Sequence, residues 1–172
     1  MVGIIVTVLV SRGSSSADSE PSGGSAPGKQ ATPSATVSNE DEGAAPKVRY
    51  TGGIRIALDS GGGDIDLDSK PPLVGPSNEG SDIFIGANTD GPDIGTEDSS
   101  LTMALLPGSG PAPSERECNE KIEKNGIYNT PLARGARLCI QSKEGRTAYL
   151  RTVAAPTAGP VQFAVTVWEQ PS

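Results

Sequence analysis

Short runs in which apolar and polar residues alternate constrain the fold of this chain more than any other feature. In the clearest run, residues 161–168, Val161, Phe163, Val165 and Val167 share one face. Side chains of a strand alternate with a period of two, so this run predicts a half-buried β-strand. Glycine, proline and aspartate turns separate it from similar runs at residues 47–58, 64–68, 83–85, 101–105, 136–141 and 147–153. The pattern predicts a mainly β fold: a small sandwich or barrel of seven to eight short antiparallel strands with one short covering helix.

The predicted helix begins at Ser114. Ser114 and Glu117 have the spacing of a capping box, in which each side chain binds the other residue's backbone N–H. Cys118 and Ile122 follow on one narrow face, which we expect to point inward. Gly126 is suited to a left-handed position that ends the helix after about three turns.

Two hairpins are predicted on either side of this helix. Residues 136–141 and 147–153 flank a turn at 143–146, and with residues 161–168 they form a three-stranded meander. Nearer the N-terminus, residues 47–58 and 64–68 flank the glycine-rich turn 60–63, which predicts a hairpin with one buried face and one solvent-exposed face.

The chain has two cysteines, Cys118 and Cys139, and no histidine. Their spacing is unlike that of metal-binding or redox CxxC pairs, and a zinc site would lack ligands. We therefore expect a disulfide rather than two free buried thiols, with Cα atoms about 5.5–6 Å apart. Cys139 alternates with Leu138 and Ile140, so it should face the helix instead of their side of the strand.

Residues 1–10 form an apolar segment that is too short to cross a bilayer as a helix. The favoured interpretation is the outer part of a signal-anchor. The second interpretation is a secretory signal, with Ser15, Ser16 and Ala17 as its cleavage site. The third interpretation is a core strand of the fold. Under the first two, the protein lies in the cell membrane with its domain on the extracellular side, or is secreted.

Residues 11–46 consist largely of Ser, Gly, Ala, Pro and Thr. Such a segment cannot bury enough apolar surface to offset the entropy lost on ordering, so it predicts a disordered linker. Residues 47–172 then form the disulfide-bearing β-domain. An apolar start, a polar tether and a compact domain with a disulfide describe a domain displayed outside a membrane.

Two acidic segments are candidate calcium sites. Asp59, Asp64, Asp66 and Asp68 flank a glycine run, but one strand face offers few converging ligands, and we expect no calcium there. Residues 86–97 place Asn88, Asp90, Gly91 and Glu97 at positions 3, 5, 6 and 12 of an EF-hand loop, yet position 1 is Gly86. An ordinary polar loop is the better prediction for the second segment. Neither a metal nor any other cofactor is expected.

Catalysis and nucleic-acid binding have little support in the sequence. Without histidine, the usual activation of a serine or cysteine nucleophile is missing. Gly108-Ser109-Gly110 lies among prolines and is typical of a linker. Paired carboxylates remain the one route to a hydrolase. A net charge of −7 argues against nucleic acid as a partner, because phosphate binding needs clustered Lys and Arg.

Residues 137–148 and 165–169 resemble a group of actinobacterial domains of unknown function, in which an "LC-[VI]-x-[ST]-x-EGR-x-A" stretch precedes a closing "VTVW" strand. In that group an upstream cysteine begins a short helix, and residues 65–69 are similar to its "VDLDS" element. The resemblance covers roughly residues 50–170. It implies an extracytoplasmic module that follows a membrane span, as in some serine/threonine kinase-like and stand-alone membrane proteins. It implies no activity for any residue, and this chain lacks every kinase motif.

These observations predict a non-catalytic binding or sensory domain outside the cell, tethered to a membrane through residues 1–10, with an extracytoplasmic ligand or protein of unknown identity as its partner. A surface hydrolase with paired carboxylates and a structural protein of the cell envelope are the alternatives.

Overall fold

The computed structural model describes residues 46–58, 62–76, 80–97 and 102–170. The predicted segment 1–10 and the predicted linker 11–46, apart from Pro46, lie outside the described residues. In the part that is described, no helix has the length and the apolar character needed to cross a bilayer.

Ten strands and one helix make up the described ranges, where the sequence predicts seven to eight strands. They are β1 (Val48–Ile56), β2 (Gly62–Asp66), β3 (Leu73–Gly75), β4 (Ile83–Asn88), β5 (Gly91–Thr96), β6 (Met103–Leu106), α1 (Glu115–Asn125), β7 (Asn129–Pro131), β8 (Arg137–Gln141), β9 (Thr147–Ala154) and β10 (Val161–Trp168).

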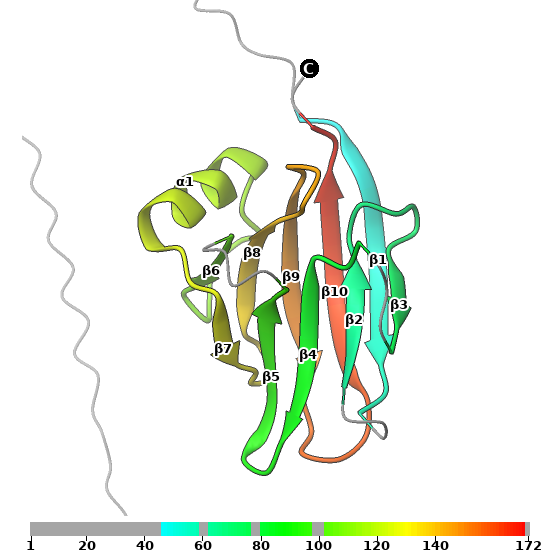
Figure 1. Cartoon of the computed structure of the whole chain (residues 1–172). Coiled ribbons are helices and arrows are strands. Elements are labelled where there is room, and N and C mark those ends of the chain that lie inside the picture. The colour runs from blue at the N-terminus through cyan, green and yellow to red at the C-terminus, as the bar shows by residue number, and fades with distance from the viewer. Residues whose placement is uncertain (1–45, 59–61, 77–79, 98–101, 171–172) are drawn as a thin grey trace, which may run out of the picture. The chain divides into compact units, whose positions relative to one another are not determined.

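Two antiparallel sheets lie face to face (Figure 1). The first sheet has the strand order β1-β10-β9-β8-β6, and the second sheet has the order β3-β2-β4-β5-β7. The prediction of a mainly β fold is confirmed, and of its two forms the structure has the sandwich. Strands β8, β9 and β10 form the predicted meander, with Gly145 at φ +81° in the turn between β8 and β9.

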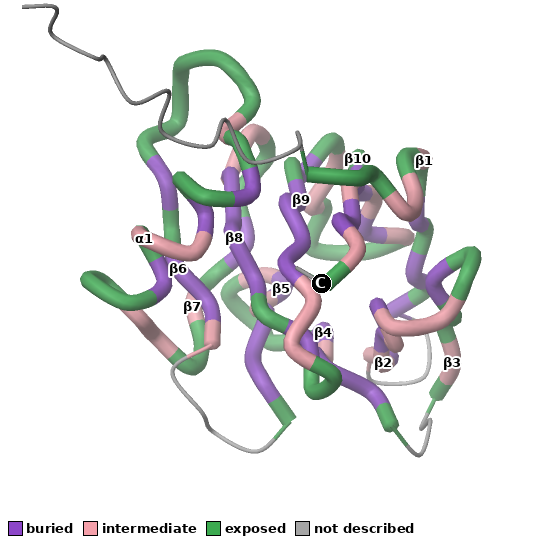
Figure 2. The backbone as a smooth tube through the Cα atoms, turned by 90° about the horizontal axis from the view of Figure 1, so that it is seen from above, coloured by how far each residue is buried: buried purple, intermediate pink, exposed green. Residues whose placement is uncertain are grey.

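The main core fills the space between the sheets. Strand β10 supplies Val161, Phe163, Val165 and Val167, each at most 2% exposed, as its alternation predicts. Ile65 and Ile85 meet them from the second sheet. Figure 2 shows buried residues along the strands of both layers. Burial of one such side chain stabilises the fold by about 1.5–3 kcal/mol, so these two faces supply most of the driving force.

A second, smaller core lies on the outer face of the first sheet, where α1 covers it. Cys118 and Ile122 of α1 pack there against Cys139, Tyr149 and Trp168. The first sheet is therefore apolar on both faces beneath α1. This explains why Trp168 is 6% exposed although it lies on the opposite face of β10 from Val165 and Val167.

The predicted hairpin between residues 47–58 and 64–68 is wrong. Strand β1 pairs with β10 in the first sheet, with Ile54 opposite Phe163, whereas β2 pairs with β3 and β4 in the second. Ile56 and Ile65 nevertheless belong to one core cluster. Each strand buries its apolar face from opposite sides of that core, and alternation alone does not say which strand is the hydrogen-bonding partner.

The start of α1 matches the prediction and its end does not. Ser114 and Glu117 form the complete capping box, and their hydrogen bonds lower the pKa of Glu117. Gly126, in contrast, has φ −58° and ψ 135°, so the predicted left-handed cap is wrong. The next residue explains why: Ile127 N donates to Met103 O at 2.7 Å, and this pairing with β6 requires an extended chain.

Residues 86–97, predicted as a polar loop, belong to the hairpin of β4 and β5. Asn88 pairs with Gly91 at its tip, where Gly91 has φ +125°. Glu97 lies beyond the other end of β5, and a strand of this length spans roughly 20 Å. The EF-hand-like positions are therefore spread along a hairpin and do not converge on an ion.

Candidate binding site

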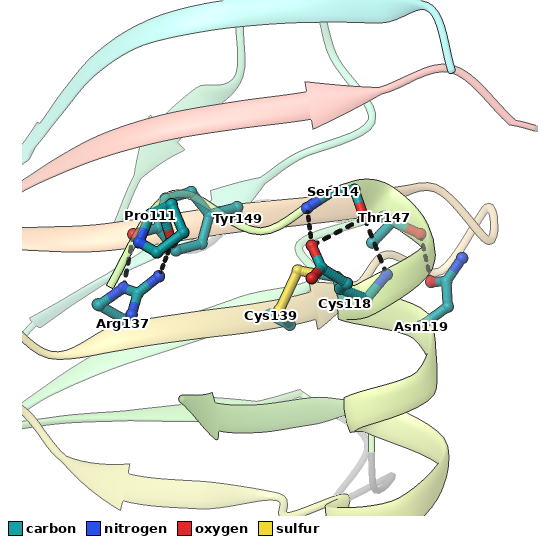
Figure 3. The surroundings of a disulfide bond; sticks show 9 residues. Pro111, Ser114, Cys118, Asn119, Arg137, Cys139, Thr147 and Tyr149 are labelled. Carbon is teal, nitrogen blue, oxygen red and sulfur yellow. Dashed lines mark hydrogen bonds between the residues drawn. A yellow bond between two sulfur atoms is a disulfide. The ribbon is translucent and has the colours of Figure 1, made fainter. Parts of the chain in front are cut away.

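The disulfide between Cys118 and Cys139 joins α1 to β8, as predicted (Figure 3). Its sulfur atoms are 2.01 Å apart, and its Cα atoms are 5.1 Å apart, slightly closer than the expected 5.5–6 Å. Neither residue is exposed. Cys139 points toward α1, away from Leu138 and Ile140, which lie in the main core. The bond holds the helix against the outer face of the first sheet.

Arg137, at the start of β8, binds the chain that leads into α1. Its Nε donates to Tyr149 Oη at 3.0 Å, and Nη1 donates to the carbonyls of Pro107 and Ser109 at 2.9 and 2.7 Å. Nη2 donates to the carbonyl of Pro111 (Figure 3). Gly108-Ser109-Gly110, predicted as linker, is thus held against the sheet by one arginine that is only 6% exposed.

Arg151 lies directly opposite Arg137 on the neighbouring strand β9. Its side chain is exposed, and no described residue makes a hydrogen bond or ion pair with its guanidinium. Arg137 likewise has no carboxylate partner within the described ranges. Two like charges directly opposite each other destabilise a sheet. The stability of the sheet therefore does not explain why an arginine stands opposite Arg137.

A groove opens beside the two arginines on the outer face of the first sheet, with a volume of about 530 Å³. We call it the outer groove. Thr51, Ala164, Thr166 and Arg151 line it from β1, β10 and β9, and residues 108–110 with Arg137 line its other side. Gly52 and Ala164 also line the groove, so small residues make up part of its floor. Pockets of this size hold small molecules.

The structure brings together a different set of aspartates from the one predicted from the sequence. Asp66, Asp68 and Asp82, which we call the acidic clip, have carboxylate oxygens within 4.8 Å of one another. Asp64 is outside this group, and Asp59 lies outside the described residues. Asp82, the residue before β4, was not among the candidates predicted from the sequence.

Backbone and side-chain donors fill the acidic clip. Asp82 accepts from Leu67 N and Lys143 N, both at 2.7 Å, and burial raises its pKa to about 6. Asp68 accepts from Glu144 N at 3.0 Å and from Arg146 Nη1 at 2.8 Å. These contacts fasten the end of β2 to the turn between β8 and β9, so they join the two sheets at one end of the sandwich.

The clip also connects two segments that carry the resemblance to the actinobacterial domains. Asp66 and Asp68 belong to the "VDLDS"-like element, and residues 142–146 contain the "EGR" stretch. Asp66 caps its own segment by accepting from Asp68 N and Ser69 N at 2.8 and 3.1 Å. A structural role therefore accounts for both segments. The expectation of no calcium at this cluster and the resemblance itself stay predictions.

The outer groove has one local signal in the sequence. A five-residue turn between the predicted strands 136–141 and 147–153 already sets Arg137 opposite Arg151. The covering segment 107–111 and the wall it forms depend on the side-chain contacts of Arg137 and have no local signal.

Comparisons of the chain with protein-family models, with curated protein sequences and with solved structures find no match.

Proposed function

We propose that residues 47–172 form a non-catalytic binding domain, displayed outside a membrane to which residues 1–10 tether it, and that the outer groove is its ligand site. The observation that carries this proposal is the uncovered half of the first sheet's outer face. Helix α1 and residues 107–111 cover one half, while the other half is left as a groove with charged and hydroxyl groups around a floor of small side chains.

The hydrogen bonds and burial of the clustered carboxylates favour a binding domain over a hydrolase. A hydrolase of the paired-carboxylate type needs two carboxyl groups that reach a substrate. In the acidic clip, each oxygen of Asp82 accepts a backbone N–H, and the residue is 5% exposed. Asp68 is engaged by Glu144 and Arg146. These groups are used to hold loops together.

The disulfide supports the extracytoplasmic placement, because oxidising compartments retain such bonds and the cytosol reduces them. A thiol assay tests this part. The full chain is expressed in an actinobacterial host, unfolded without reductant and treated with a maleimide reagent. We expect no labelled thiol in wild type and two after reduction. Two labelled thiols before reduction would contradict the placement.

A second experiment tests ligand binding at the outer groove. The ¹⁵N-labelled full chain is titrated with a panel of neutral, cationic and anionic sugars and amino acids. We expect at least one compound to give saturable chemical-shift changes centred on the amides of Thr51, Ala164 and Thr166. Changes confined to other surfaces would reject the groove as the ligand site, and the conversion of any panel compound would reject the non-catalytic role.

A further inference from the structure

The geometry points to an oxyanion as the ligand of the outer groove: we infer that Arg151 and the hydroxyl of Tyr149 bind a carboxylate or phosphate group of a small organic acid. This inference rests on the proposed function and adds the chemical class of its ligand. Three features support it, namely the charge of the site, its free hydrogen-bond donors and its size.

The charge of the site is unbalanced. Arg137 and Arg151 face each other across β8 and β9, and the described lining of the groove contains no carboxylate. This occurs in a chain whose net charge is −7, where acidic partners are plentiful elsewhere. Arg49 and Arg146, for comparison, pair with Glu169 and Asp68. An anion placed between the two arginines would turn their repulsion into attraction.

The two arginines have different roles, because they differ in how many of their N–H donors are already used in hydrogen bonds. A guanidinium has five N–H donors. Four of those of Arg137 are used by Tyr149 and by three backbone carbonyls, so Arg137 is fixed in place and contributes mainly its positive charge. The guanidinium of Arg151 makes no hydrogen bond to any described residue, so its donors are free to bind a carboxylate or phosphate in the two-point manner.

The Tyr149 hydroxyl completes the site. Its oxygen accepts from Arg137 Nε at 3.0 Å, so its own proton points elsewhere and has no acceptor among the described residues. Tyr149 and Arg151 are both on β9, two residues apart, and both line the groove. A hydroxyl that accepts a bond from a charged group is a stronger donor, since hydrogen bonds in a chain polarise one another.

The dimensions of the groove favour a small acid. Its volume of about 530 Å³ suits a ligand of roughly monosaccharide to disaccharide size. The small side chain of Ala164 in the lining leaves room for a flat ring or carbon chain above the sheet. Thr51 and Thr166, opposite each other on β1 and β10, add hydroxyl groups for the ligand's polar edge.

The test uses three soluble probes of similar size or charge. The ¹⁵N-labelled full chain is titrated with sodium galacturonate, with sodium phosphate and with neutral galactose, all at one constant ionic strength set by sodium chloride. The two anions distinguish a carboxylate from a phosphate. We expect saturable shifts at the amides of Arg151 and Ala164 with at least one anion, and none with galactose.

Arg151→Gln is the diagnostic variant, because it removes the charge and the fork of an exposed side chain. We expect it to weaken anion binding about tenfold to hundredfold. Arg55→Gln is the matched control. Arg55 is also an exposed arginine of the first sheet, on β1, but it does not line the outer groove, so this variant should bind the anion within twofold of wild type.

Three results would overturn the inference. An equal loss in both variants would indicate general attraction to a positive surface. An absence of saturable shifts with both anions would exclude an oxyanion site. Saturable shifts with galactose and not with the anions would also exclude it, while leaving the groove as a binding site and the proposed function intact.

Discussion

Removal of the disulfide should release α1 from the sandwich before it unfolds the rest. The change is the double variant Cys118→Ala, Cys139→Ala, compared with wild type in the absence of reductant. In α1 the buried residues are Glu115, Cys118 and Ile122. An 11-residue helix is not stable in isolation, so once the covalent bond is gone its attachment to the first sheet depends on Ile122 and on the hydrogen bond from Thr147 Oγ1 to Asn119 Oδ1 at 2.6 Å.

The expected magnitude follows from the loop that the bond closes. The two cysteines are 21 residues apart, and a crosslink of this length restricts the unfolded chain by about 3 kcal/mol on the chain-entropy model. Both side chains are fully buried, so the alanines also lose some packing under α1. For a domain of this size, such a loss corresponds to a melting temperature lower by roughly 10 °C.

Two measurements on the full chain check the reasoning. Urea denaturation gives the free energy of unfolding of the variant, of oxidised wild type and of wild type after reduction. Hydrogen exchange then reports on α1 alone, and we expect its amides to lose most of their protection while those of β9 and β10 keep theirs. Lys121→Ala, an exposed change on the same helix, serves as the control and should stay within about 0.5 kcal/mol of wild type.

The reasoning is refuted if the double variant loses less than about 1 kcal/mol and α1 keeps its hydrogen-exchange protection. That outcome would mean that noncovalent packing alone holds the helix on the sheet.

Two further predictions concern the acidic clip. Asp68→Asn should lower the free energy of unfolding by about 1–3 kcal/mol, because the side chain of Arg146, only 14% exposed, loses its charged partner. Urea denaturation should show a far smaller effect for Glu144→Gln, the other partner of Arg146, and equal losses in the two variants would contradict a role for Asp68 in holding the sheets together. The pKa of Asp82, raised by burial from 3.8 to about 6, means that this group stabilises the folded state at low pH and that the contribution is lost as pH rises through 6. Between pH 7 and pH 4, wild type should therefore gain about 2 kcal/mol relative to Asp82→Asn, and parallel pH profiles for the two proteins would reject the assignment.

Local features of the sequence determined the elements of this protein. Alternation placed the inward face of β10, and a capping box placed the start of α1, because both depend on residues that are neighbours along the chain. The position of Cys139 between Leu138 and Ile140 was enough to predict which side of β8 would meet the helix. The short turn after β8 also implied that Arg137 and Arg151 are opposite each other.

Tertiary structure decided everything that depends on a distant partner. Strand β1 carries the alternation expected of a hairpin strand, yet it pairs with β10, more than a hundred residues away along the chain. Asp82 joined the acidic clip because the fold brings β4 beside the turn after β8. Residues 108–110 became a wall of the outer groove because Arg137 donates to the carbonyls of Pro107, Ser109 and Pro111. The periodicity of a sequence shows which face of a strand is apolar. The pairing of strands, the acidic clip and the outer groove form only when separate apolar faces are buried together in one core.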